Sequence, residues 1–248
     1  MTAEKELFMK TIFSLFVIPL VVVFIGCKDY DNKIPADDKS ITISPEFEKF
    51  LIKSKIDPDT KPDGQISYRD IKDVDSLNIL LEGNGNSLEG LEHFTNLKYL
   101  KYTGNQIPTN DANRYYYAFT AGVIKDFVPS LDTLDVSKNM KLQFVECSGL
   151  GDGGGYSSSI GYLRLGKNDQ LKSIIASKSM MSSIDLSGVP NLENLDIVEC
   201  YNLLKVNICS NNRLKTLNSW QVKKFYISSV SSKKANWSTG SAAFSECK

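Results

Sequence analysis

The sequence has little of what metal and nucleophile chemistry requires. Its 248 residues include one histidine, His93, and five cysteines, none of them in a CxxC pair. Zinc sites and Cys–His catalytic pairs need several such residues, so the sequence argues against both and predicts no enzyme. A net charge is also lacking, because 29 Lys and Arg balance 29 Asp and Glu. Without a basic field, we expect no nucleic-acid partner.

No apolar run is long enough for an ordinary membrane-spanning helix. The run over 11–26, "TIFSLFVIPLVVVFIG", has 16 residues, whereas such a helix needs about 20. Lys5 and Lys10 precede the run, and small Gly26 ends it just before Cys27. A positive start, a short apolar region and a small residue are typical of a secretory signal.

The end of this run, "FIGC", resembles the lipobox of bacterial lipoproteins, in which the cysteine, here Cys27, is lipidated and becomes the N-terminus. The following "CKDYDNK" resembles the signal that sends some lipoproteins of Gram-negative anaerobes to the cell surface. The resemblance implies a signal peptide over 1–26, a polar tether over 27–43 and an outer-membrane lipoprotein. An uncleaved anchor and an ordinary secretory signal remain alternatives.

The first module after the tether, 44–73, is expected to be a helical cap. "SPEFEKFLIKSKI" begins with Ser44 as a helix N-cap and Pro45 at the first helical position. The next stretch, "DTKPDGQISYRD", matches a twelve-position calcium loop through Gly64, Ile66 and three candidate ligands: Asp59, Asp63 and Asp70.

Lys61 argues against calcium in this loop, because it puts a positive charge at the third ligand position. The alternative is a metal-free cap in which Gly64 makes the turn and Ile66 packs inward. No cofactor is therefore expected.

A spacing pattern repeats from 74 to 228. In "LKYLKYTGN", Leu97, Leu100, Tyr102 and Asn105 occupy positions one, four, six and nine. The same template recurs in "LDTLDVSKN" and "IGYLRLGKN", and later copies start at Leu171, Met181, Leu192, Leu203 and Leu214. Two successive copies make 21 or 22 residues, the length of one leucine-rich repeat coil. Coils of this kind bury their apolar positions only by stacking on each other.

These matches, together with "LEGLEHFTNLKYL", resemble the leucine-rich repeats of bacterial surface lipoproteins and, more loosely, of internalins. The resemblance implies a strand-rich α/β-type solenoid of 21–22-residue coils with a short helical cap, followed by a C-terminal cap or tail over 229–248. The two half-coils alternate, so strands are expected on two sides.

Four cysteines follow Cys27. Cys147 falls at a core position and Cys200 at an Asn position, so both are expected to be small buried side chains. Cys209 points outward and Cys247 lies in the polar tail. Those two are the expected disulfide pair in an oxidising compartment.

One side of the expected solenoid carries exposed aromatic and aliphatic residues among charges, as recognition surfaces do. Its candidate ligand-binding residues are Tyr99, Lys101, Phe144, Glu146, Ile175 and Asp196. The insertion between Leu97 and Leu131 adds Tyr115, Tyr116 and Tyr117, which are either a contact surface or local core.

The function expected from these features is binding of a protein or glycan by a surface lipoprotein, as in adhesion or partner recognition. The alternative is a structural or accessory subunit of an outer-membrane glycan-handling complex. Repeat scaffolds bind many kinds of ligand, so the sequence does not name one.

Overall fold

The computed structural model of the protein describes residues 37, 39–81, 86–103, 131–149, 160–229 and 236–247. The chain divides into two units, Met1–Ile34 and Pro35–Lys248, and every described residue belongs to the second. None of the helices within these described ranges is long and apolar enough to span a bilayer.

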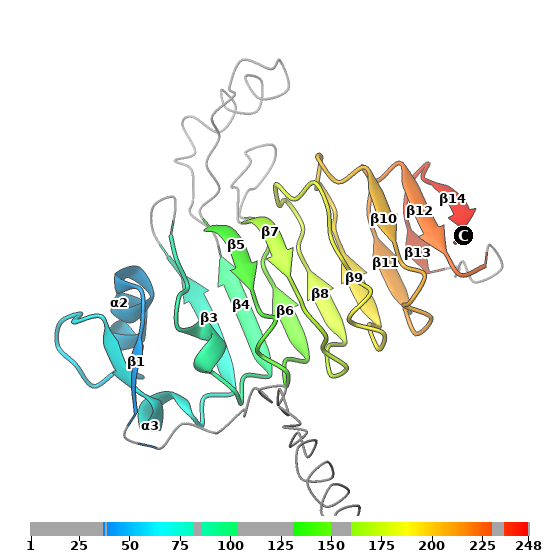
Figure 1. Ribbon diagram of the computed structural model, residues 1–248. Coiled ribbons are helices and arrows are strands. Elements are labelled where there is room, and N and C mark those ends of the chain that lie inside the picture. The colour runs from blue at the N-terminus through cyan, green and yellow to red at the C-terminus, as the bar shows by residue number, and fades with distance from the viewer. Residues whose placement is uncertain are drawn as a thin grey trace, which may run out of the picture. The chain divides into compact units, whose positions relative to one another are not determined.

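A small cap opens the second unit (Figure 1). Strand β1 (Ser40–Thr42) pairs antiparallel with β2 (Gln65–Ser67), and the helices α2 (Pro45–Lys53) and α3 (Tyr68–Ile71) follow those strands in the chain. Gly64 adopts a φ of +83° just before β2, a conformation that glycine reaches without strain. Ile66 is buried. Both features confirm the turn and the inward packing expected of this loop.

Helix α2 begins where the Ser-Pro pair predicts, but the Ser44 side chain does not cap it. Pro45 stands at the first turn, and Ser44 is the N-cap residue without a side-chain capping bond. Its hydroxyl instead donates to the Ser87 carbonyl at 2.7 Å. Ser44 is nearly fully buried, so pairing its hydroxyl with a backbone acceptor satisfies both groups. The N-cap serine therefore ties the cap to the first coil.

The cap also closes the hydrophobic core. The rings of Phe47 on α2 and Phe94 lie 5.6 Å apart, and both side chains are fully buried. Phe94 directly follows the 3-10 helix η1 (Leu91–His93) of the first coil. Without α2, these apolar side chains would face water at the open end of the stack.

The repeats form parallel sheets whose strands come from successive coils (Figure 1). The larger sheet has seven strands: β3 (Ser76–Leu80), β4 (Tyr99–Thr103), β6 (Phe144–Glu146), β8 (Ser173–Ile175), β9 (Asn194–Asp196), β11 (Thr216–Asn218) and β13 (Trp237–Ser238). The remaining strands form two smaller parallel sheets: β5 (Leu131–Asp135) with β7 (Ile160–Arg164), and β10 (Lys205–Asn207), β12 (Lys224–Ile227) and β14 (Ala243–Glu246). Because consecutive strands from β4 to β8 alternate between the large sheet and a smaller one, the expected alternation of half-coils is observed.

Strand register confirms the repeat length. Ser173 pairs with Asn194, 21 residues later, and Asn194 pairs with Thr216, 22 residues later. Tyr99 pairs with Phe144 across the larger insertion, 45 residues later. The fold is therefore of leucine-rich repeat type, with insertions accommodated between paired strands.

The core lies between the sheets. On five strands of the large sheet the fourth template position is at most 1% exposed, in the row Leu100, Val145, Ile174, Leu195 and Leu217. Burying one such side chain stabilises the fold by about 1.5–3 kcal/mol. Each of these residues contacts the equivalent residue of the neighbouring strand, so stability depends on the stack.

Asparagines at the ninth template position link the coils. The buried side-chain amides of Asn139, Asn168 and Asn211 each donate to two backbone carbonyls of the preceding coil. Asn168, for instance, reaches the carbonyls of Asn139 and Leu142 at 3.2 and 3.1 Å. These bonds satisfy carbonyls in the turns, where no strand partner is present.

Cysteine takes over this role in one coil. Cys200 stands at a ninth position, is fully buried, and its Sγ donates to the Ala176 carbonyl at 3.1 Å. Burial raises the pKa of Cys200, as it does for the buried Cys147 thiol, so both remain protonated. The expectation of small buried cysteines is confirmed, and Cys200 adds a hydrogen bond that the sequence did not indicate.

The segment over 229–248 contributes two further strands. β13 pairs parallel with β11, and β14 pairs parallel with β12. Phe244 on β14 stacks on Phe225 with ring centroids 5.6 Å apart. A disulfide joins Cys209 to Cys247 with a Cα separation of 6.2 Å, as the sequence predicts. The last strand is thus fixed both by pairing and by a covalent link.

Replacing Asn168 by Ala should lower the free energy of unfolding by about 1–3 kcal/mol, because two buried hydrogen bonds are lost. The Asn139 carbonyl keeps its bond from the Leu142 N–H. Urea unfolding followed by circular dichroism measures the loss. Asn191→Ala is the matched control, since its amide also donates to the preceding coil but through a bond open to solvent. Equal losses for the two variants would contradict a special role for the buried ladder.

Removing the disulfide with the double change Cys209→Ser and Cys247→Ser should cost about 2–5 kcal/mol, because the unfolded chain loses a cross-link over 38 residues. Denaturant midpoints with and without dithiothreitol measure this. Reductant should lower the midpoint of the natural protein and leave the double variant unchanged. If dithiothreitol leaves the denaturant midpoint of the natural protein unchanged, the disulfide assignment is wrong.

Candidate functional site

The candidate face is the outer side of the large sheet. Side chains alternate along a strand, so the residues on either side of the buried row point away from the core. Tyr99 and Lys101 flank Leu100 on β4, and Phe144 and Glu146 flank Val145 on β6. Lys101 and Glu146 are register partners, and their row continues through Ile175 on β8 to Asp196 on β9. The structure therefore brings all six predicted residues of the sheet onto four adjacent strands.

Two aromatic residues lie side by side on this face. Tyr99 and Phe144 are register partners on β4 and β6, although 45 residues separate them in the chain. Tyr99 is 49% exposed and Phe144 is half-buried. Two rings on neighbouring strands provide apolar contact area that a partner can cover.

An ion pair lies next to the two rings. Lys101 Nζ and Glu146 Oε1 are 2.8 Å apart and come from the same two strands. Both side chains are accessible, so the pair contributes only about 0–1 kcal/mol to stability. Its charges compensate each other, which leaves the ring pair in a locally neutral setting.

Asp196 is engaged with its neighbours rather than free. It accepts hydrogen bonds from the Ser177 hydroxyl, from the Val198 N–H and, at 3.1 Å, from the Asn218 side-chain amide. On the adjacent row, Thr216 Oγ1 donates to Asn194 Oδ1 at 2.6 Å. The end of the sheet around β9 and β11 is thus a polar network, whereas the aromatic contact area lies around β4 and β6.

Two exposed apolar residues extend the face beyond the predicted set. Leu80 is 58% exposed at the end of β3, and Trp220 is 63% exposed just after β11. Both occupy the seventh template position of their coils, counted from Val74 and Leu214. The repeat pattern predicts that this position points outward. It does not predict how far neighbouring side chains cover Leu80 and Trp220.

The smaller sheets present a different outer surface. Arg164 Nη1 lies 3.0 Å from Asp135 Oδ2, and Lys224 stands over the ring of Tyr226 at 5.0 Å. Burial acts to raise the pKa of Asp135, but the hydrogen bonds from Ser137 and the Arg164 guanidinium outweigh it and lower the pKa. Tyr162 is the large exposed aromatic residue of this surface, at 52%.

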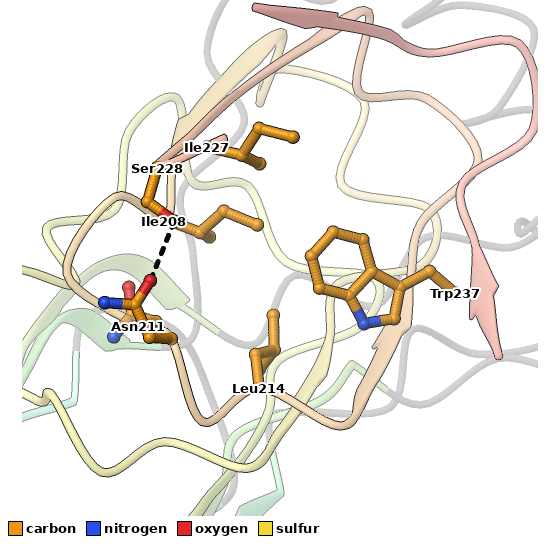
Figure 2. A pocket seen from close by; sticks show the side chains of 7 residues that line it. Ile208, Asn211, Leu214, Ile227, Ser228 and Trp237 are labelled. Carbon is orange, nitrogen blue, oxygen red and sulfur yellow. Dashed lines mark hydrogen bonds between the residues drawn. The ribbon is translucent and has the colours of Figure 1, made fainter. Parts of the chain in front are cut away.

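Figure 2 shows the small pocket near the end of the stack. Its volume of about 10 Å³ has room for about one water molecule and not for a small-molecule ligand. The Ser228 hydroxyl donates to Asn212 across one side. The lining consists mainly of interior residues of the repeats: Ile208, Asn211, Asn212, Leu214, Ile227, Ser228 and Trp237. We assign it no ligand.

Of the three candidate ligands in the predicted calcium loop, Asp59 alone belongs to the group of carboxylates found close together among the described residues. Asp63 is exposed, and its carboxylate accepts from the Gln65 N–H at 2.9 Å, within the loop. The N–H groups of Asp63 and Gly64 point at the buried Glu48 carboxylate. Asp59 is exposed and Asp70 is half-buried. The loop therefore closes around a carboxylate of α2.

Four predicted residues lie outside the described ranges. They are Cys27, Tyr115, Tyr116 and Tyr117.

Comparison with known proteins gives weak similarities only. No protein-family model and no curated relative matches the chain. An internalin, InlF of Listeria monocytogenes, is 14% identical, covering 83% of this chain and 72% of its own, with a TM-score of 0.35. The functional domain of InlJ from the same species, described as including a cysteine ladder, is 10% identical, covering 86% and 73%, with a TM-score of 0.25. At such TM-scores neither similarity carries an argument, so the class, a leucine-rich repeat protein, rests on the coils described above.

Proposed function

We propose that this chain is a cell-surface lipoprotein whose repeats form one leucine-rich repeat solenoid that binds a protein or other macromolecule. The observation that carries the proposal is the contiguous pair Tyr99 and Phe144 with the compensated ion pair of Lys101 and Glu146 beside it. An aromatic centre with a polar rim is the usual composition of a protein-binding patch.

The extent of the patch bears on its affinity. Four strands about 4.8 Å apart, each offering two or three outward residues, cover a few hundred Å². A standard interface buries about 800 Å² per partner. The proposed contact therefore extends along the sheet to Leu80 at its start, with Ile175 and Asp196 at the polar side and the Tyr115–Tyr117 insertion as an additional contact.

The anchor is the second part of the proposal. Lipid on Cys27 would hold the repeats at the outer surface of an outer membrane, with 27–43 as the tether. The support is the signal-like run that ends at Gly26 and Cys27.

Alanine at Tyr99 or Phe144 should weaken partner binding at least about tenfold, because each removes an aromatic contact at the centre of the patch. The partner is first captured by affinity purification from surface-labelled cells, and dissociation constants are then measured with purified protein. Tyr162→Ala is the matched control, as this ring is equally exposed but belongs to the other sheet side. If Tyr162→Ala weakens binding and Tyr99→Ala does not, the face assignment is wrong.

Changing Cys27 to Ser should release the protein from membranes, because the only acceptor for the proposed lipid is lost. Detergent-phase partitioning of the full chain expressed in a Gram-negative host tests this, and mass spectrometry of the purified protein locates the mature N-terminus. A Cys27→Ser variant that stays in the membrane fraction would favour the uncleaved anchor instead.

A further inference from the structure

Three carboxylates meet in the cap, away from the candidate face. Glu48 lies on α2, and Asp57 and Asp59 follow the helix. One oxygen from each of the three side chains lies within 4.8 Å of the other two. Glu48 is fully buried and Asp57 is 3% exposed, whereas Asp59 is open to solvent. Two of the three charges are therefore removed from water.

Backbone donors fix the position of these carboxylates. Glu48 accepts from the Asp63 N–H at 2.7 Å through one oxygen and from the Gly64 N–H at 2.8 Å through the other. Asp57 Oδ1 accepts from the Asp59 N–H at 3.0 Å. Both oxygens of Glu48 and one oxygen of Asp57 are therefore fixed in position by the backbone.

The second carboxylate oxygen of Asp57 accepts no hydrogen bond from the described residues. Asp57 Oδ2 is buried and has no hydrogen-bond partner in the part of the chain that the structure describes. A buried polar atom without a partner is rare in native structures and calls for an explanation, such as an ion. Asp57, which carries this unpaired oxygen, is one of the three clustered carboxylates. The unpaired oxygen therefore points to a ligand bound by the cluster.

Among the described residues, no ion pair balances the charges of this cluster. The ion pairs found among the described residues leave out Glu48, Asp57 and Asp59. Carboxylates whose oxygens lie within 4.8 Å of one another repel each other when they are charged. Buried charges in proteins are paired or coordinate a metal, so a cation would resolve this repulsion.

We propose that Glu48, Asp57 and Asp59 bind a calcium ion. Calcium takes six to eight oxygen ligands at about 2.3–2.6 Å, so two ligands on opposite sides of the ion lie up to roughly 5 Å apart. The mutual separations of up to 4.8 Å in the cluster fit that span. Magnesium, with ligands at about 2.0–2.1 Å, would require a tighter and strictly octahedral arrangement.

This site differs from the calcium loop expected from the sequence. Asp59 is the one residue common to both, while Asp63 and Asp70 are replaced by Glu48 and Asp57. The objection raised by Lys61 does not apply, because that exposed residue is not among the three ligands. Asp59, on the solvent side, leaves room for water to complete the coordination shell.

Binding at this site would link α2 to the segment that follows it. Glu48 lies in the first turns of the helix, whereas Asp57 follows its end and donates its backbone N–H to Leu51 at 3.3 Å. An ion bound by both residues would fix the segment after α2 against the helix.

Calcium titration of the purified full-length chain, by calorimetry and by melting in EDTA, CaCl₂ or MgCl₂, tests the proposal. The natural protein should bind calcium with a dissociation constant of about 10⁻⁴–10⁻³ M, as extracellular modules do, and should melt at a higher temperature in calcium than in EDTA. Absence of binding up to about 10 mM calcium, or an equal affinity for magnesium, would overturn it.

Variants distinguish the two possible ligand sets. Asp57→Asn and Asp59→Asn should each weaken calcium binding at least about tenfold, and Asp63→Asn, the matched exposed control, should leave it unchanged. In EDTA, Asp57→Asn should melt no lower than the natural protein because it removes repulsion, and exposed Asp59→Asn tests the site without disturbing the core. Loss of binding in Asp63→Asn, with binding kept in Asp57→Asn, would place calcium in the loop over 59–70 instead.

Discussion

The contact between equivalent residues of successive coils is the constraint on which the rest of the structure depends. Leu100 meets Val145, Val145 meets Ile174, and the row continues to Leu217, every member buried. A single coil has no interior, so each half-coil is stable only between its neighbours. The outward residues inherit their positions from this row. Tyr99 and Phe144 are adjacent because Leu100 and Val145 are.

The two ends of such a stack need separate solutions. At the start, α2 covers the first coil with Phe47, and the Ser44 hydroxyl bonds to the coil's backbone. At the other end, Phe244 stacks on Phe225, and Cys247 is joined covalently to Cys209. The six predicted residues lie between these ends, on β4, β6, β8 and β9, each of which has a neighbour on both sides. The sheet there is rigid, which suits a surface that presents fixed side chains to a partner.

Periodic features of the sequence predicted much of this fold. The template placed Leu100, Tyr102 and Asn139 in the interior, and the Ser-Pro pair placed the start of α2, because each depends on neighbours a few residues away. The missing details depend on distant partners. The Ser44 hydroxyl bonds to Ser87, and Glu48 accepts from Asp63 and Gly64, groups 15 or more residues away that follow no period. The same holds for the candidate site. The sequence predicts which positions point outward, but it does not predict the exposure of Leu80 or the hydrogen bonds of Asp196.

The link between Cys209 and Cys247 has a mechanical consequence. When a chain is pulled on either side of a disulfide, tension passes through the sulfur bond and bypasses the residues enclosed by it. The segment that contains β11, β12, β13 and β14 lies within the 38-residue separation of the two cysteines. A pull along the chain would therefore extend the preceding coils while this segment bore no load. However far the preceding coils extend, the disulfide would keep the two ends of this segment joined.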